Sequence, residues 1–140
     1  MKGLSILFAL VVTQFLMAQS VFGKWKTIDD VTGEEKSIVQ VYEENGIVYG
    51  KIIEIFNPEN RNKTCTECTG KLKNKPLLGM VFLYGLKKDG KECNDGNIVD
   101  PKTGKEYDCY IELEDQNTLK VRGYVGISIA GRTQYWKSAK

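Results

Sequence analysis

Two alternating runs of residues on either side of Asn45-Gly46 constrain the fold more than any other feature of this sequence. Lys36–Glu44 reads KSIVQVYEE and Ile47–Phe56 reads IVYGKIIEIF. Both runs are rich in β-branched residues and alternate with the two-residue period of a strand. Asn-Gly is a preferred centre for a two-residue hairpin turn because both positions tolerate positive φ. The sequence therefore predicts a β-hairpin whose tip is Asn45-Gly46.

The turn also predicts the register of this hairpin and the face that it buries. The expected pairs on one face are Glu44 with Ile47, Tyr42 with Tyr49, Gln40 with Lys51 and Ile38 with Ile53. The other face carries Val39, Val41, Val48, Gly50 and Ile52. We expect this second face to point inward, because it is the more apolar of the two.

Alternation continues along the chain, and no apolar stripe after Trp25 has the 3.6-residue spacing of a helix over a sufficient length. Glu106–Leu113 and Thr118–Val125 predict a second hairpin, with Leu113 facing Leu119 inside and Glu112 facing Lys120 outside. The remaining expected strands are Lys24–Asp29, Met80–Lys87, Asn97–Asp100 and Arg132–Ser138. Asp100-Pro101-Lys102-Thr103-Gly104 predicts a turn, because proline presets φ and glycine supplies a left-handed position.

Eight antiparallel strands joined mostly by short turns predict an all-β fold: a single eight-stranded up-and-down barrel. Closure into a barrel leaves no open strand edge. Asn57–Gly79 is the one long irregular stretch, and we expect it to form a disulfide-stapled surface loop, with a flap over one end of the barrel as the functional alternative.

The first residues have the composition of a secretory signal peptide. Met1-Lys2-Gly3 is a short cationic start, Leu4–Met17 is mainly apolar, and Ala18 and Ser20 are small. The apolar run is shorter than a membrane span and contains polar breaks, so we expect cleavage after Ala18 or Ser20. Residues 1–18 are then the signal and residues 19–140 the barrel, which would lie in the periplasm or outside the cell without membrane insertion.

Four cysteines are an even number, and in an oxidising compartment they predict disulfides. Three pairings are possible. The closeness of Cys65 to Cys68 favours a local bridge, which leaves Cys93 with Cys109. Zinc is less compatible with this spacing, because Cys93 and Cys109 stand apart instead of forming a second CxxC pair. A redox-active CxxC usually sits at a helix N-terminus in a βαβ unit, and none is predicted here.

Composition excludes several functional classes. The chain has no histidine, so it has no Ser-His or Cys-His nucleophile pair and no histidine-ligated metal. A formal charge of +2 is too small for a nucleic-acid-binding surface. No sequence feature indicates a cofactor or a metal.

Several runs of this sequence resemble an uncharacterised family of small secreted bacterial proteins, domain-of-unknown-function family 2147. They are Gly23–Trp25, Val41–Gly46, Tyr49–Ile52, Cys65–Cys68, Lys75–Gly79, Gly96–Tyr107, Leu119–Gly126 and Gly131–Trp136. These runs fall in the order of the family and span nearly the whole chain after the signal. The resemblance implies a periplasmic or secreted barrel similar to lipocalins, in which the CxxC is more typical than Cys93 and Cys109.

Lipocalins open with a Gly-x-Trp element whose indole closes one end of the barrel beneath an arginine from the last strand. Gly23-Lys24-Trp25 resembles the first part, and Arg132 is the matching candidate for the arginine. The resemblance therefore implies a cation–π contact between Arg132 and Trp25, with any ligand entrance at the opposite end.

The favoured function is binding or carriage of a small apolar or amphipathic molecule inside the barrel. The candidate lining residues are Val39, Val41, Val48, Gly50, Ile52, Phe82, Tyr84, Ile111, Val121 and Gly123. Glycine within a strand either opens a cavity or admits a bulky neighbour. The sequence does not indicate an oligomeric state.

Two other hypotheses compete with a carrier. A filled barrel would instead bind protein or glycan through outer tyrosines, namely Tyr42, Tyr49, Tyr110, Tyr124 and Tyr135. An enzyme would depend on the carboxylates of Asp89, Glu92, Asp95 and Asp100. Acidic residues beside glycine are more often turn formers, so we do not expect catalysis.

Overall fold

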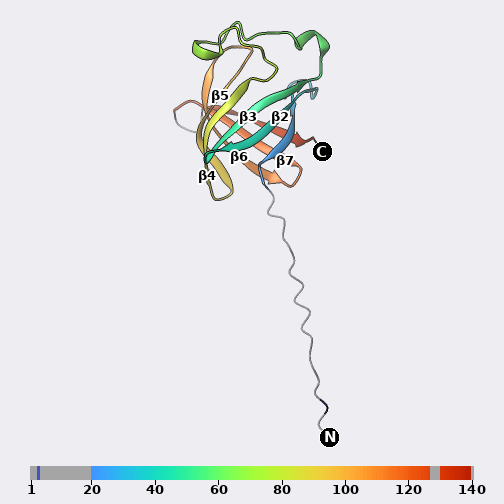
Figure 1. The fold of residues 1–140 in the computed structure, drawn as a ribbon, viewed down its shortest axis with the longest axis vertical. Coiled ribbons are helices and arrows are strands. Elements are labelled where there is room, and N and C mark those ends of the chain that lie inside the picture. Colours follow the sequence, from blue (N-terminus) through green and yellow to red (C-terminus); the bar gives the residue numbers. More distant parts are fainter. Residues whose placement is uncertain (1–2, 4–19, 127–129, 140) are drawn as a thin grey trace.

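The computed structural model describes residue 3 and residues 20–126 and 130–139, and within these ranges it forms one closed barrel. The predicted signal peptide therefore lies almost entirely outside the described residues. The strands are β1 (Gly23–Ile28), β2 (Glu35–Glu44), β3 (Ile47–Ile55), β4 (Val81–Asp89), β5 (Glu92–Val99), β6 (Glu106–Asp115), β7 (Thr118–Tyr124) and β8 (Gly131–Ser138). Each strand pairs antiparallel with the next, and β8 pairs back with β1 (Figure 1). The predicted all-β, eight-stranded up-and-down barrel is confirmed.

The β2–β3 hairpin turns at Asn45-Gly46, both of which have positive φ. Tyr42 lies opposite Tyr49, as predicted. Toward the other end of the hairpin the register shifts at a bulge between Ile38 and Val39, so Ile38 lies opposite Glu54. The predicted pairing of Ile38 with Ile53 is wrong, because the inserted residue moves the partner by one position.

Strand β5 is longer than predicted, since Glu92–Val99 replaces the expected Asn97–Asp100. Asp95-Gly96 has the composition of a turn, but Asp95 has φ 59° inside the strand, where the β5–β6 register shifts. A left-handed residue within a strand is typical of a bulge. The β6–β7 hairpin has the predicted pairs, Leu113 with Leu119 and Glu112 with Lys120.

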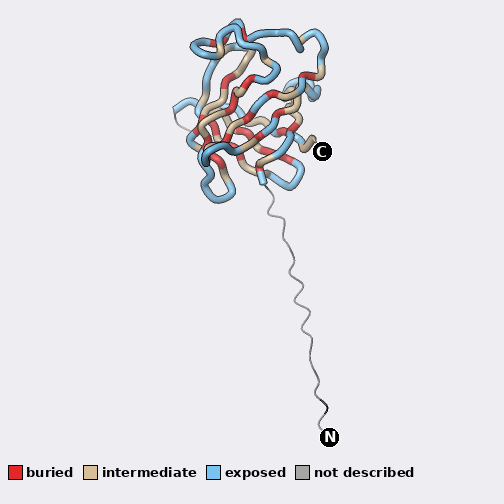
Figure 2. The backbone as a smooth tube through the Cα atoms, in the orientation of Figure 1, coloured by how far each residue is buried: buried red, intermediate tan, exposed pale blue. Residues whose placement is uncertain are grey.

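The hydrophobic core fills the half of the barrel nearest the short hairpin tips. Val39, Val41, Val48 and Ile111 are each no more than 1% exposed. The buried residues lie along the strands, and the connecting loops are mostly exposed (Figure 2). Trp25 is also buried at this end, and its Nε1 donates to the Val21 carbonyl oxygen at 2.8 Å. This closed end is the one with the Asn45-Gly46 tip, because β1 pairs with the part of β2 that precedes it.

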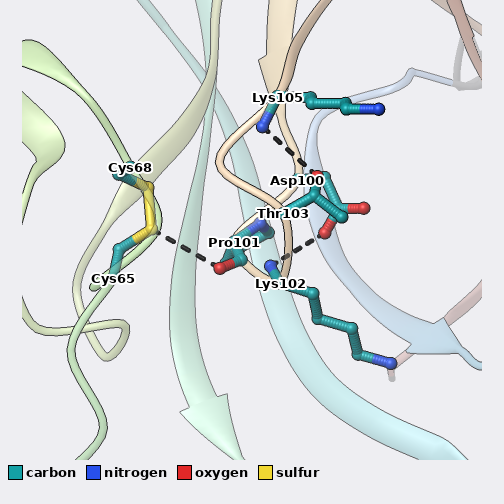
Figure 3. The surroundings of a disulfide bond; sticks show 7 residues. All are labelled: Cys65, Cys68, Asp100, Pro101, Lys102, Thr103 and Lys105. Carbon is teal, nitrogen blue, oxygen red and sulfur yellow. Dashed lines mark hydrogen bonds between the residues drawn. A yellow bond between two sulfur atoms is a disulfide. The ribbon is translucent and has the colours of Figure 1, made fainter.

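The connection from β3 to β4, residues 56–80, forms a flap at the other end of the barrel (Figure 1). It contains two 3₁₀ turns, Pro58–Asn60 and Gly70–Leu72, and the predicted Cys65–Cys68 disulfide. Both sulfurs are buried beside the turn that joins β5 to β6 (Figure 3). Cys65 Sγ lies 3.5 Å from the Pro101 carbonyl oxygen, a close contact in which the bonded sulfur has no proton to donate.

Cys93 and Cys109 are both free and buried, so the predicted second disulfide is wrong. They lie on the neighbouring strands β5 and β6, but Cys93 is opposite Ile111 and Cys109 is opposite Gly96. The two thiols are therefore offset along the strands instead of paired across them.

Within the described residues, no helix is long and apolar enough to span a membrane.

A candidate ligand cavity at the mouth of the barrel

A cavity of about 530 Å³ occupies the end of the barrel beneath the flap. Its inner wall is apolar and includes Ile52, Phe82, Val121 and Trp136. Its rim is charged and includes Asp29, Asp30, Lys36, Lys102 and Arg132. The rim residues belong to the loops and strand ends opposite the closed end. An apolar interior with a few polar groups is typical of small-molecule sites, and the volume lies in their usual range.

The two inward glycines of the barrel strands have different surroundings, and only Gly123 lines the cavity. A Cβ on Gly123 would meet Ile98 and Tyr107 at 3.5 Å, which is ordinary van der Waals contact. Gly50 is different, since a Cβ there would lie 2.9 Å from atoms of Leu83, whose side chain fills that space. Of these two inward glycines, Gly123 leaves room for a ligand and Gly50 admits a bulky neighbour.

Strand β8 spans the depth of the cavity with three inward residues. Arg132 lies at the rim, Gln134 lies one step below it, and Trp136 is 1% exposed at the floor. At about 3.3 Å per residue, the backbone positions of Arg132 and Trp136 are about 13 Å apart. Trp136 Nε1 donates to Gln134 Oε1 at 3.2 Å, and the indole ring packs against Phe82 with 6.0 Å between ring centroids.

The seam between β1 and β8 opens toward the cavity. The two strands pair at Trp25 with Ser138 and at Lys26 with Lys137, whereas β7 pairs with β8 along its whole length. Beyond Lys26 the seam separates, and Thr27 and Ile28 line the cavity. We conclude that the mouth extends into the barrel wall at this seam.

Arg132 closes the outer end of this seam instead of covering Trp25. Its Nε donates a hydrogen bond to Asp30 Oδ2 at 2.7 Å, and its Nη2 donates a second hydrogen bond to Asp30 Oδ1. The predicted contact between Arg132 and Trp25 is wrong. Trp25 lies opposite Ser138, six residues from Arg132 along β8, which is about 20 Å of strand.

Asp29 organises the remaining charges of the rim. Its Oδ1 accepts from the backbone N–H groups of Thr32 at 3.0 Å and Val31 at 2.9 Å. Its Oδ2 lies 3.0 Å from Lys36 Nζ and 4.0 Å from Lys102 Nζ. The hydrogen bond from Thr32, together with Lys36 and Val31, holds the pKa of Asp29 well below its usual range. The contact with Lys102 and the bond to Asp29 raise the pKa of Lys36, and the neighbouring Lys36 lowers the pKa of Lys102.

The predicted lining residues fall into three groups. Ile52, Phe82, Val121 and Gly123 line the cavity. Val39, Val41, Val48, Gly50 and Ile111 are buried in the wall and core and are not part of its lining. Tyr84 lines a second pocket of about 360 Å³, between the flap and β4, with Cys68 and Leu72. Whether any of them contacts a ligand stays a prediction.

The carboxylates considered for an enzyme are spread from the closed end of the barrel to its mouth, with Asp95 inside β5. Asn94 Nδ2 donates to Asp89 and Glu92, which flank the β4–β5 tip at the closed end. Asp100 lies at the mouth, where its Oδ1 accepts from the Lys102 N–H. Among the residues that the structure describes, no three Cys, Asp or Glu side chains form a group that could hold a metal ion.

The outer tyrosines largely pack against one another. Tyr42 stacks on Tyr49 with 5.6 Å between ring centroids, and Tyr110 lies 6.3 Å from Tyr124. Lys120 Nζ lies 5.7 Å from the centre of the Tyr110 ring. Tyr135 is the most exposed of the five, at 47%. Cross-strand pairing thus accounts for four of these side chains.

Sequence reasoning did not identify Gln134, Trp136 or the acidic residues of the rim. Gln134 and Trp136 could have been predicted, because Arg132, Gln134 and Trp136 are two residues apart and therefore share one face of a strand. Asp29 and Asp30 could not, since their place at the mouth depends on which loops converge there.

The barrel resembles a solved structure. That structure is described as "Protein HP1028 from the human pathogen Helicobacter pylori belongs to the lipocalin family". The match has a TM-score of 0.75 and 22% sequence identity, and it covers 86% of this chain and 84% of that chain. At this identity the likeness shows a shared fold. No curated protein matches the chain.

A family model matches residues 23–138, which is the whole barrel from β1 to β8. Its description reads "Uncharacterized protein conserved in bacteria (DUF2147)". The chain belongs to this bacterial family.

Proposed function

We propose that the protein binds a small apolar or amphipathic molecule in the cavity at the mouth of the barrel and carries it outside the cytoplasm. The observation that carries this proposal is the cavity itself, whose apolar wall lies beneath a charged rim. The Helicobacter pylori protein of similar fold is described as a lipocalin, which is consistent with a carrier.

The distribution of polarity favours an amphipathic ligand. The apolar part would pack on Phe82, Val121 and Trp136, where burial from water supplies the affinity. The polar part would lie near Lys102 and the Asp29–Lys36 pair, where it remains in contact with water.

Export is proposed from the N-terminal segment and from the disulfide. A buried Cys65–Cys68 bridge is the kind of bond that persists in an oxidising compartment. Both expected cleavage points, after Ala18 and after Ser20, leave Val21 in the mature chain. Val21 is needed there because it is 7% exposed and its carbonyl accepts the Trp25 indole N–H.

Native mass spectrometry tests this function directly. Protein exported into a bacterial periplasm and purified without organic solvent should carry a bound small molecule that denaturation releases. The emptied protein should then bind one equivalent of the apolar fluorophore N-phenyl-1-naphthylamine. A protein that is always empty and does not bind the fluorophore would contradict the proposal.

A further inference from the structure

We propose that Gln134 donates a hydrogen bond to the ligand, so that the ligand carries an acceptor oxygen, such as a carbonyl, within its buried part. This inference rests on the proposed function and specifies the chemistry of the molecule bound. It follows from the orientation of one amide group beside the apolar part of the cavity wall.

The neighbouring indole fixes the orientation of the Gln134 amide. An indole N–H can only donate, so the atom that it contacts at 3.2 Å must be the amide oxygen of Gln134. The amide nitrogen therefore points away from Trp136 and presents two N–H donors. Within the described part of the chain, the hydrogen bond of the Gln134 side chain is the one that its oxygen accepts from Trp136.

These two donors face the cavity. Gln134 lines the cavity, lies opposite Val121 across the β7–β8 pair, and is only partly buried. No buried side-chain nitrogen or oxygen of the described residues lacks a partner, so the free NH₂ group is not enclosed in the packed wall. It reaches the open space that a ligand would occupy.

Three other polar side chains of the cavity lining are engaged within the protein. The Thr27 and Ser37 hydroxyls bond each other at 2.6 Å, and Arg132 is held by Asp30. Gln134 is two residues below Arg132 on β8, or about 7 Å deeper in the cavity. A ligand that displaces water from this amide without an acceptor would leave both N–H groups unpaired, which is unfavourable. The geometry therefore selects a ligand whose acceptor lies about 7 Å below the rim.

A matched pair of probes tests this selection. 2-Acetylnaphthalene and 2-isopropenylnaphthalene have the same heavy-atom skeleton, and a carbonyl oxygen in the first replaces a CH₂ group in the second. Their affinities are measured by displacement of N-phenyl-1-naphthylamine. Gln134→Leu should weaken binding of the ketone by about 2- to 10-fold relative to the hydrocarbon. The carbonyl stretch of the bound ketone should also move to higher frequency in this variant.

Two further variants separate the donor from structural effects. Gln134→Glu keeps the acceptor for the Trp136 N–H and removes the two donors, so it should lose the ketone preference as well, and it replaces Gln134→Leu if that variant does not fold. Gln40→Leu makes the same substitution at an exposed position of β2 outside the cavity, and it should leave the ratio of the two affinities unchanged.

The outcomes distinguish this inference from the function on which it rests. If the fluorophore and both probes bind but the ratio is insensitive to Gln134, the binding function stands and the role of Gln134 is overturned. If Gln134→Leu weakens both probes equally, Gln134 acts only through the shape of the wall, and the inference is again overturned. If neither the fluorophore nor the probes bind, the carrier function fails and the inference fails with it.

Discussion

Gly104 and Glu67 lie in two different loops, and the backbone of Glu67 occupies the space in which a side chain at position 104 would begin. Gly104 has φ 72° in the turn between β5 and β6, and Glu67 lies between the two bridged cysteines of the flap. The flap therefore docks on this turn only because residue 104 is glycine. This contact sets the position of the flap above the cavity.

Gly104→Ala should destabilise the protein by more than its backbone conformation alone explains. An alanine with a left-handed backbone conformation lowers the free energy of unfolding by about 1–2 kcal/mol. The overlap with Glu67 adds about 1–3 kcal/mol, because the flap must shift. Gly90→Ala is the matched control, since Gly90 has φ 61° with open space around it. Urea unfolding of both variants measures the difference, and equal losses would mean that the flap does not dock on Gly104.

The Cys65–Cys68 disulfide should contribute moderately to stability. It closes a loop of four residues, for which the chain-entropy model gives about 2 kcal/mol. Cys65→Ala/Cys68→Ala should therefore lower the Tm by several degrees and increase proteolysis within the flap. Reductant should lower the Tm of the native chain and leave that of the double variant unchanged. An effect of reductant on the double variant would show that another bond is present.

Cys93 and Cys109 should behave as two protected thiols. Burial raises the pKa of Cys109 to about 12 and also raises that of Cys93, so little thiolate is present at pH 8. Titration with a disulfide reagent should detect no reactive thiol in the folded protein and two in denaturant. If no reactive thiol is detected in denaturant, Cys93 and Cys109 are joined by a disulfide, which would contradict the structure.

The charge of Asp29 should give a pH-dependent contribution to stability. Its pKa is depressed in the folded state, so the contribution is complete above the usual value of 3.8 and is lost as the pH falls toward the lowered value. Asp29→Asn keeps an acceptor for Val31 and Thr32 but removes the charge beside Lys36. The Tm difference between the two proteins should be constant from pH 7 to about 5 and narrow below about 4.

Glu44→Gln provides a control for this pH series, because Glu44 is an exposed carboxylate at the hairpin tip of the closed end. Its Tm should follow that of the native chain across the series. A gap between Asp29→Asn and the native chain that stays constant to pH 2 would contradict the role of the charge.

Local patterns were sufficient to predict the strands and most of their pairing. Asn45-Gly46 and the Leu113–Leu119 pair each depend on residues close in sequence, and both are confirmed. The bulge at Asp95 was missed because Asp-Gly indicates positive φ without indicating whether the chain reverses there. The sequence therefore predicts the backbone conformation of such a residue, but it does not predict whether the residue lies in a turn or within a strand.

The interior could be predicted less well, because it depends on the volumes of residues distant in sequence. Gly50 and Gly123 are both inward glycines within strands, yet Leu83 fills the space beside the first, whereas a Cβ on the second would make only ordinary contacts with Ile98 and Tyr107. The position of Arg132 could have been predicted from the order of the strands. Antiparallel pairing of the first and last strands places the start of β8 beside the end of β1, far from Trp25.

Fluorophore binding by Gly123→Leu tests most directly whether the cavity at the mouth holds the ligand. Gly123 lines the cavity, has no positive φ and would give a Cβ only ordinary contacts, so a leucine there should extend into the cavity and leave the Tm unchanged or higher. We predict that the native chain and Gly123→Ala bind one equivalent of N-phenyl-1-naphthylamine and that Gly123→Leu does not. Equal binding by all three folded proteins would contradict a ligand site inside the barrel.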